Sequence, residues 1–189
     1  AEAAKEFIAK LLASQVEKGR LPAEHMQAAL DRIAVSSDLK DMAKAHCVVE
    51  AIFERLDIKQ EMFARLDEIC GPETIIATNT SSLPVTAIAA KSKHAGRIGG
   101  MHFFNPVPVM KLVEVIKGLQ TSADVTARTI DLARAMGKTA VPANDRAGFV
   151  SNRVLMPLIN EAFYAWMEGV AEPANIDEIM KLGCAHPMG

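Results

Sequence analysis

Residues 47–78, CVVEAIFERLDIKQEMFARLDEICGPETIIAT, contain the pattern that decides the fold. The stretch begins at 47–52 with a β-branched run of the kind found in a buried strand. It continues with an amphipathic helical pattern from Leu56 to Cys70, which Gly71-Pro72 ends, and it closes on a second apolar run at 74–78. A strand, a helix and another strand in this order are typical of a βαβ unit with parallel strands.

The alternation of helices and strands continues on both sides of this unit. Two helical patterns precede it, one ending at Gly19 and the other running from Pro22 to Ile33. After it, residues 121–124 predict the start of a helix and Gly137 its end. The remaining strand candidates are residues 97–104, 111–116 and 139–141, and Pro142 favours a sheet edge for the last one. We therefore predict an α/β domain with a mostly parallel sheet.

A change of pattern near Arg146 divides the predicted fold. Residues 144–148 are polar, and only helical patterns follow them, at 149–168 and 173–182. Helices without intervening strands favour a separate all-α domain. We predict a first, α/β domain over residues 1–146 and the start of a helical domain over residues 147–189.

The composition excludes several classes of protein. Of the 189 residues, 50% are hydrophobic and 23% are charged, so we expect a packed core rather than disorder. The formal net charge of -2 argues against a nucleic-acid interface, and no apolar run reaches the ~18 residues of a membrane helix. Cys47, Cys70 and Cys184 form no CxxC pair, so we expect no disulfide framework, no metal site and a reducing, cytosol-like compartment.

Two polar clusters follow strand candidates, where ligands bind in open α/β sheets. Asn79-Thr80-Ser81-Ser82 comes directly after the apolar run at 74–78, and His102-Phe103-Phe104-Asn105-Pro106 lies at the end of the candidate at 97–104. Hydroxyl and amide side chains after a strand are also typical of a turn or a helix cap. For the first cluster the residues alone leave both interpretations open.

His102 and Glu114 are the candidate acid–base pair. The unperturbed pKa of histidine, ~6.5, suits proton transfer near neutrality, although a histidine beside two phenylalanines is often only a core residue. Glu114 interrupts an otherwise apolar strand candidate, and burying a carboxylate is costly unless it is paired. Either Glu114 faces outward from an edge strand, or it orients His102 and favours its protonated form.

Asn152 is a further candidate, because it lies just inside the first helix after the boundary and could face a cleft between the domains. The alternative is an ordinary residue at the start of a helix.

The sequence contains no G-x-G-x-x-G loop, no P-loop and no G-x-S-x-G motif. From the residues alone, the prediction therefore stops at two domains with a candidate His–Glu pair in the cleft.

Several motifs resemble those of the L-3-hydroxyacyl-CoA dehydrogenase family. The most specific are HFFNP at 102–106 and KLVEVI at 111–116. Four more match in order and spacing, namely VVEAI at 48–52, NTSS at 79–82, GFV and NR within 148–153, and MKLG and PMG within 180–189. The resemblance covers nearly the whole chain.

The resemblance implies an NAD-dependent oxidation of a 3-hydroxyacyl-CoA to a 3-oxoacyl-CoA, and the reverse reaction, in fatty acid or butyrate metabolism in the cytoplasm. It also implies a Rossmann-type domain that binds NAD, and a helical domain that closes over a short acyl-CoA and forms a homodimer. The implied catalytic residues are His102 as the base, Glu114 as its partner, and Ser81 and Asn152 around the 3-oxygen. The implied cofactor contacts are Glu54, Lys59, Ser81 and Asn105.

The sequence departs from the family pattern at its two ends. Family members begin with a strand and a glycine-rich phosphate loop, and their helical domain is longer. We therefore expect the chain to be a fragment of a longer active protein and to be inactive alone. The alternatives are a related dehydrogenase that acts on hydroxy acids or sugar acids without CoA, the dehydrogenase part of a multifunctional enzyme, and an inactive truncated paralogue.

Overall fold

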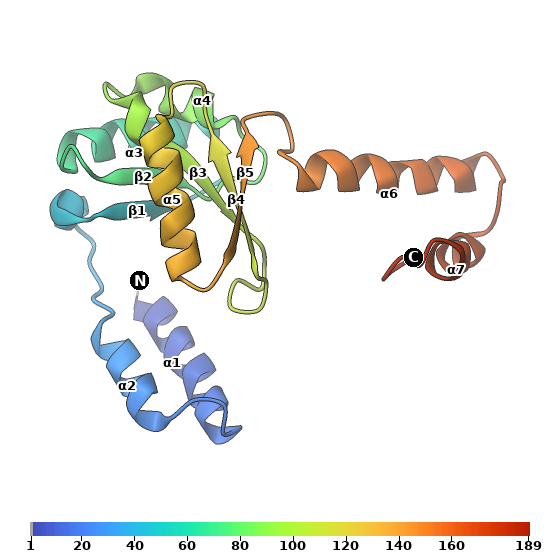
Figure 1. The fold of residues 1–189 in the computed structure, drawn as a ribbon, viewed down its shortest axis with the longest axis horizontal. Helices are drawn as coiled ribbons and strands as arrows, with labels where there is room; N and C mark the ends of the chain where they lie inside the picture. The colour runs from blue at the N-terminus through green and yellow to red at the C-terminus, as the bar shows by residue number, and fades with distance from the viewer. Residues whose placement is uncertain (1) are drawn as a thin grey trace.

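Five strands form one sheet in the order in which they occur in the chain, in a computed structural model that describes residues 2–189 (Figure 1). They are β1 (Cys47–Glu50), β2 (Ile75–Thr78), β3 (Ile98–Phe103), β4 (Leu112–Lys117) and β5 (Thr139–Asn144). β1, β2 and β3 are parallel, β4 is antiparallel to β3, and β5 is parallel to β4. The predicted mostly parallel α/β sheet is confirmed.

Helices cover both faces of the sheet (Figure 1). On one face, α3 (Leu56–Ile69) packs Phe63 and Leu66 into a core that also contains Ile76 and Ile98. Four short elements complete this part of the chain: the 3-10 turn η1 (Leu39–Lys44) precedes β1, and α4 (Val85–Ile88) and the 3-10 turns η2 (Ala89–Lys91) and η3 (Ala95–Arg97) lie between β2 and β3. On the other face, α5 (Ala123–Ala135) packs against β3, β4 and β5. Successive residues of β2 belong to different cores, since Ile76 packs with residues of α3 and Ala77 packs with Met101 and Val113.

Two strand boundaries differ by more than one residue from those expected from the sequence. β1 ends at Glu50 rather than at Ile52, because the Glu50 carboxylate accepts a hydrogen bond of 2.6 Å from the Ile52 backbone N–H and turns the chain. β5 extends to Asn144, since its pairing with β4 continues that far. Pro142 does lie in an edge strand, where its missing N–H is tolerated.

The close approach of β3 and β4 requires a glycine at one position. Gly100 lies opposite Ile116 in the antiparallel register. A Cβ atom at Gly100 would lie 2.8 Å from the Ile116 Cβ and 3.3 Å from a methyl group of Val85. The glycine therefore allows α4 to sit directly over the two strands that carry the candidate acid–base pair.

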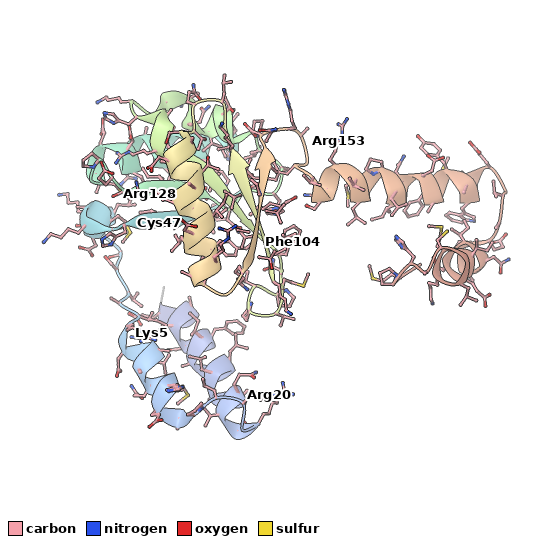
Figure 2. The ribbon with its side chains drawn as sticks, viewed as in Figure 1. Lys5, Arg20, Cys47, Phe104, Arg128 and Arg153 are labelled. Carbon is pink, nitrogen blue, oxygen red and sulfur yellow. The ribbon has the colours of Figure 1, made fainter. Side chains whose placement is uncertain are left out.

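Helices at the two ends of the chain project from the sheet domain. α1 (Glu2–Glu17) and α2 (Ala23–Asp31) pack on each other as a hairpin that carries Lys5 and Arg20, and the Lys5 ammonium donates to the Ile33 carbonyl at 2.7 Å (Figure 2). α6 (Ser151–Met167) and α7 (Pro173–Gly183) extend in a different direction from the sheet domain and contain no buried residue (Figure 1). No helix in residues 2–189 is both long and apolar enough to cross a membrane.

A buried ion pair fixes α3 to the start of β3. The Arg97 guanidinium contacts Asp67 Oδ1 at 2.8 Å and also donates to the Asp67 and Cys70 carbonyls. Burial raises the pKa of Asp67, but the hydrogen bonds from Arg97 and from the backbone N–H groups of His94 and Lys93 outweigh it and lower that pKa. Asp67 is therefore held as a carboxylate in a site with almost no access to water.

We expect Arg97→Met to lower the free energy of unfolding by about 3 kcal/mol or more, because Asp67 would keep a buried charge without its guanidinium. Arg55→Met is the matched control, since it removes an exposed arginine that pairs with Asp57, and it should lower stability far less. Urea denaturation of both variants beside the unaltered protein measures the difference. Equal losses would contradict this role of the buried pair.

Candidate active site

The antiparallel register of β3 and β4 places His102 directly opposite Glu114. Their side chains meet on the face that α4 covers, with 2.8 Å between His102 Nδ1 and Glu114 Oε2. Both residues are buried, at 5% and 3% relative exposure. Because a carboxylate only accepts hydrogen bonds, the proton between them lies on Nδ1, and Nε2 of the neutral imidazole keeps a lone pair that can accept a proton. The predicted pair therefore exists and has the tautomer that a general base needs.

Ser81 reaches the free side of the imidazole. It lies in the loop after β2, and its Oγ is 3.1 Å from His102 Nε2. The loop is anchored by Glu54, whose Oε1 accepts from the Ser81 backbone N–H at 3.1 Å and from the Thr80 hydroxyl. The first polar cluster thus forms a turn and also brings the Ser81 hydroxyl to the imidazole, while its ligand role stays a prediction.

Glu114 also binds the start of α6. Its Oε1 accepts from the backbone N–H groups of Ser151 at 3.0 Å and Val150 at 3.3 Å, and its Oε2 accepts from the Ser151 hydroxyl at 3.1 Å. A carboxylate is favourable here, since the first N–H groups of a helix have no partner within the helix. One buried carboxylate therefore joins the imidazole, the sheet and the first helix after the predicted boundary.

The chain reaches α6 through a left-handed turn that also packs on the imidazole. Gly148 has φ +75°, and a Cβ atom there would lie 2.9 Å from the Arg153 backbone nitrogen. Phe149 follows with φ 48° and is buried, with its ring centroid 5.7 Å from that of His102. Phe104 lies at 4.7 Å from the same ring. Two aromatic rings therefore restrict how the imidazole can turn.

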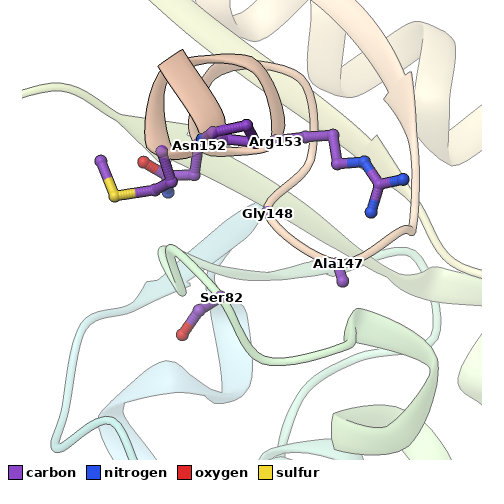
Figure 3. Close-up of a pocket in the computed structure, with 7 residues that line it drawn as sticks. Ser82, Ala147, Gly148, Asn152 and Arg153 are labelled. Atoms are coloured by element: carbon purple, nitrogen blue, oxygen red, sulfur yellow. The ribbon is translucent and has the colours of Figure 1, made fainter. Parts of the chain in front are cut away.

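Asn152 is brought to the same site. Its Nδ2 donates to the backbone carbonyl of Ser81 at 3.1 Å, across the boundary between the sheet domain and α6. Asn152 also lines a hollow of about 510 Å³ (Figure 3), whose other lining residues are Ser82, Ala147, Gly148, Arg153, Met156 and Pro157. It is therefore more than an ordinary residue at a helix start, because it links the loop after β2 to α6.

The predicted cofactor contacts Glu54 and Lys59 form a buried network rather than an open binding surface. The Lys59 ammonium is 2.7 Å from Glu50 Oε1 and 3.3 Å from Glu54 Oε2, and Lys59 is only 1% exposed. Thr78 donates to the other Glu50 oxygen at 2.8 Å. The side chain of Glu54 is 42% exposed, so it is the member of the network that a ligand can reach. The contact predicted for Lys59 stays a prediction, and what the structure gives is a cation that holds Glu54.

Asn105 lies just past the end of β3 and is exposed, as a contact to a bound molecule would require. Ser81 and Glu54 follow β2 and β1 in the same way. The carboxyl ends of parallel strands meet at one edge of a sheet, so these three side chains belong to one edge. Within residues 2–189, no three His, Cys, Asp or Glu side chains are grouped so that they could hold a metal ion.

Two residues of this constellation were not identified from the sequence. Glu50 ends an apolar strand as Glu114 interrupts one, so the rule that singled out Glu114 would also have found it. Ser151 carries no such signal, because a serine near the start of a helix is common. Only the packing of α6 against β4 brings it to Glu114.

The charge of Glu114 depends on its partners. Burial raises its pKa, but the hydrogen bonds from His102, then from the Ser151 backbone and the Ser151 hydroxyl, outweigh burial and lower the pKa below its usual range. The pKa of Glu54 is lowered in the same way. Partial burial raises it, but the hydrogen bonds from the side chains of Thr80 and Lys59 outweigh this effect. Both groups are therefore carboxylates at neutral pH.

A lowered pKa in the folded protein makes Glu114 a source of acid sensitivity. Its contribution to stability is complete above the unfolded value, about 4.3, and is lost as the pH falls through the lower folded value. We expect Glu114→Gln to reduce the stability lost between about pH 5 and pH 3, measured by urea denaturation at each pH. The matched control is Glu61→Gln, at an exposed position of α3. An unchanged pH slope in Glu114→Gln would contradict the expectation.

Comparisons with known proteins agree with this geometry. Residues 1–146 match the family model described as "3-hydroxyacyl-CoA dehydrogenase, NAD binding domain", and residues 148–189 match the one described as "3-hydroxyacyl-CoA dehydrogenase, C-terminal domain". The chain is 54% identical over all of its length to a "Probable 3-hydroxybutyryl-CoA dehydrogenase" of Bacillus subtilis, of which it covers 66%. It is 43% identical over 95% of its length to a 3-hydroxybutyryl-CoA dehydrogenase of Clostridioides difficile, of which it covers 64%.

Solved structures show the same relationship. A 3-hydroxybutyryl-CoA dehydrogenase from Escherichia coli superimposes with a TM-score of 0.97 at 44% identity, over all of this chain and 40% of that one. An (S)-3-hydroxybutyryl-CoA dehydrogenase from Ralstonia eutropha gives 0.92 at 45% identity, over 96% of this chain and 64% of that one. The chain thus spans about two thirds of the length of the two curated relatives described above.

Proposed function

The chain belongs to the 3-hydroxyacyl-CoA dehydrogenase family, and on that premise we propose that the protein that carries it interconverts a 3-hydroxyacyl-CoA and a 3-oxoacyl-CoA with NAD. The observation that carries this proposal is the chain of contacts from Glu114 through His102 to Ser81. It supports the proposal because the imidazole is held in one orientation, as a general base requires, at the edge where open α/β sheets bind ligands.

The residues at that edge fit a dinucleotide. Glu54, Ser81 and Asn105 offer a carboxylate, a hydroxyl and an amide beyond the ends of three parallel strands, and all three have exposed side-chain surface. Hydroxyls and amides of this kind hydrogen-bond ribose and carboxamide groups. We propose that these three residues contact NAD and that Lys59 fixes Glu54. When bound, NAD accepts a hydride from carbon 3 of the substrate.

His102 moves the proton in this proposal. In the direction of oxidation, Nε2 takes the proton of the 3-hydroxyl, while Nδ1–H stays bound to Glu114 and the carboxylate stabilises the imidazolium that forms. Ser81 Oγ, 3.1 Å from Nε2, lies where the 3-oxygen must approach. Asn152 holds the Ser81 carbonyl and stands next to the same position. In the reverse direction, the imidazolium returns its proton to the developing alkoxide.

The names of the relatives support a short acyl chain, since several are 3-hydroxybutyryl-CoA dehydrogenases.

We further propose a cytoplasmic homodimer in which α6 and α7 are covered. The support for the dimer is the large exposed apolar surface of α6 and α7, which includes Phe163, Trp166 and Leu182. Apolar surface of this extent on a soluble domain marks an interaction site.

We expect His102→Gln to reduce kcat about 10²–10⁴-fold, because it removes the general base but keeps the polar shape of the side chain. The assay follows NADH oxidation with acetoacetyl-CoA in the full-length protein that contains this sequence. His94→Gln is the matched control, because His94 lies beside Asp67, away from Glu114 and Ser81, and it should keep the activity.

A loss of less than tenfold in His102→Gln would demote His102 to a packing residue. Absence of turnover in a folded protein that binds NADH would contradict the CoA substrate instead. The next substrates to test would then be hydroxy acids without CoA, as the rival interpretation of the sequence requires.

A further inference from the structure

The oxygen of Glu114 that holds the imidazole also holds a hydroxyl. Glu114 accepts from four donors, which are His102 Nδ1, the Val150 and Ser151 backbone N–H groups and the Ser151 hydroxyl. The two N–H groups share Oε1, whereas the imidazole at 2.8 Å and the hydroxyl at 3.1 Å share Oε2. Ser151 therefore contacts the same atom on which the orientation of His102 depends.

The two kinds of contact from Ser151 differ in what they do. The backbone N–H groups satisfy the start of α6 and would remain with any side chain at position 151. The hydroxyl is an additional donor that draws negative charge on Oε2 away from His102 Nδ1. It thereby weakens the attraction of Glu114 for the imidazolium and holds the carboxylate in one orientation.

In the part of the chain that the structure describes, no lysine or arginine forms an ion pair with Glu114. Within residues 2–189, the titratable side chain at ion-pair distance from Glu114 is His102, which carries a charge only when it is protonated. On the neighbouring loop, Glu54 pairs with Lys59. In the first turn of α6, Arg153 lines the hollow beside Asn152 and makes no ion pair with Glu114 in the described residues (Figure 3). The hydroxyl of Ser151 is therefore a neutral group that can change the strength of the contact between Glu114 and His102.

We propose that Ser151 is a positioning residue for the acid–base step, and that its hydroxyl weakens the hold of Glu114 Oε2 on the imidazole N–H of His102. The inference rests on the proposed dehydrogenase function. It adds a residue to the acid–base machinery that acts through Glu114, without touching the substrate itself.

Removal of the hydroxyl should let Glu114 stabilise the imidazolium more strongly, because Oε2 would then accept from His102 Nδ1 alone. Oxidation needs neutral His102, so the acidic limb of kcat/KM for 3-hydroxybutyryl-CoA should move to higher pH. We expect Ser151→Ala to shift this limb upward by about half a pH unit. Ser151→Thr keeps the hydroxyl and should restore the limb to its original position.

A control at another helix start separates this effect from a loss of stability. Ser122 caps α5, where its Oγ accepts from the Val125 N–H at 3.1 Å, and it makes no contact with His102 or Glu114. Ser122→Ala should lower the denaturation midpoint but leave the limb in place. An unmoved limb in Ser151→Ala, or an equal shift in Ser122→Ala, would overturn the proposal.

A second readout does not require turnover. An NMR titration of the His102 imidazole, with its signal assigned by its absence in His102→Gln, should show the same upward shift in Ser151→Ala. If the unaltered protein fails to turn over acetoacetyl-CoA, the proposed function fails, and the titration still decides on Ser151. An identical His102 titration in the two proteins would refute the role of Ser151 whatever the activity.

Discussion

The antiparallel pairing of β3 with β4 is the constraint on which the rest of the site depends. In a sheet that is otherwise mostly parallel, this one reversal places His102 directly across from Glu114, at the separation of neighbouring strands. A shift of the register by one residue would turn one of the two side chains to the opposite face. Gly100 secures this register, because its missing side chain leaves room for Ile116 and Val85.

Two buried carboxylates, Glu50 and Glu114, hold the other site residues in place against the sheet. Glu50 at the end of β1 accepts hydrogen bonds from Thr78, Lys59 and the Ile52 N–H. Lys59 also pairs with Glu54, which holds the Ser81 loop. Glu114 on β4 gathers His102 and the start of α6. Burying a carboxylate costs desolvation free energy, and hydrogen bonds from several donors offset that free energy for each of the two groups. The donors come from segments far apart in the chain, so the same contacts that neutralise the cost also fix the loops.

Most of the fold could be predicted from residue order, because period and turn residues are local properties. The βαβ unit at 47–78, the strand that carries Glu114 and the edge position of Pro142 followed from such patterns. The strand ends were less predictable. β1 stops at Glu50 because its own side chain captures the Ile52 N–H, and β5 extends to Asn144 because β4 continues to pair with it. Both effects depend on contacts that residue order does not display.

For the site, the sequence by itself determined which side chains were unusual. A carboxylate within an apolar strand and a histidine at a strand end stand out because they conflict with their surroundings. Tertiary structure alone decided what these groups meet. The fold brings the ammonium of Lys59 to Glu50 in a buried ion pair. It also brings Asn152 to the Ser81 carbonyl, and the Ser151 hydroxyl to Glu114. Hydrogen bonds act over about 3 Å, and only the packing of α6 and the loops against the sheet brings donors tens of residues apart within that range.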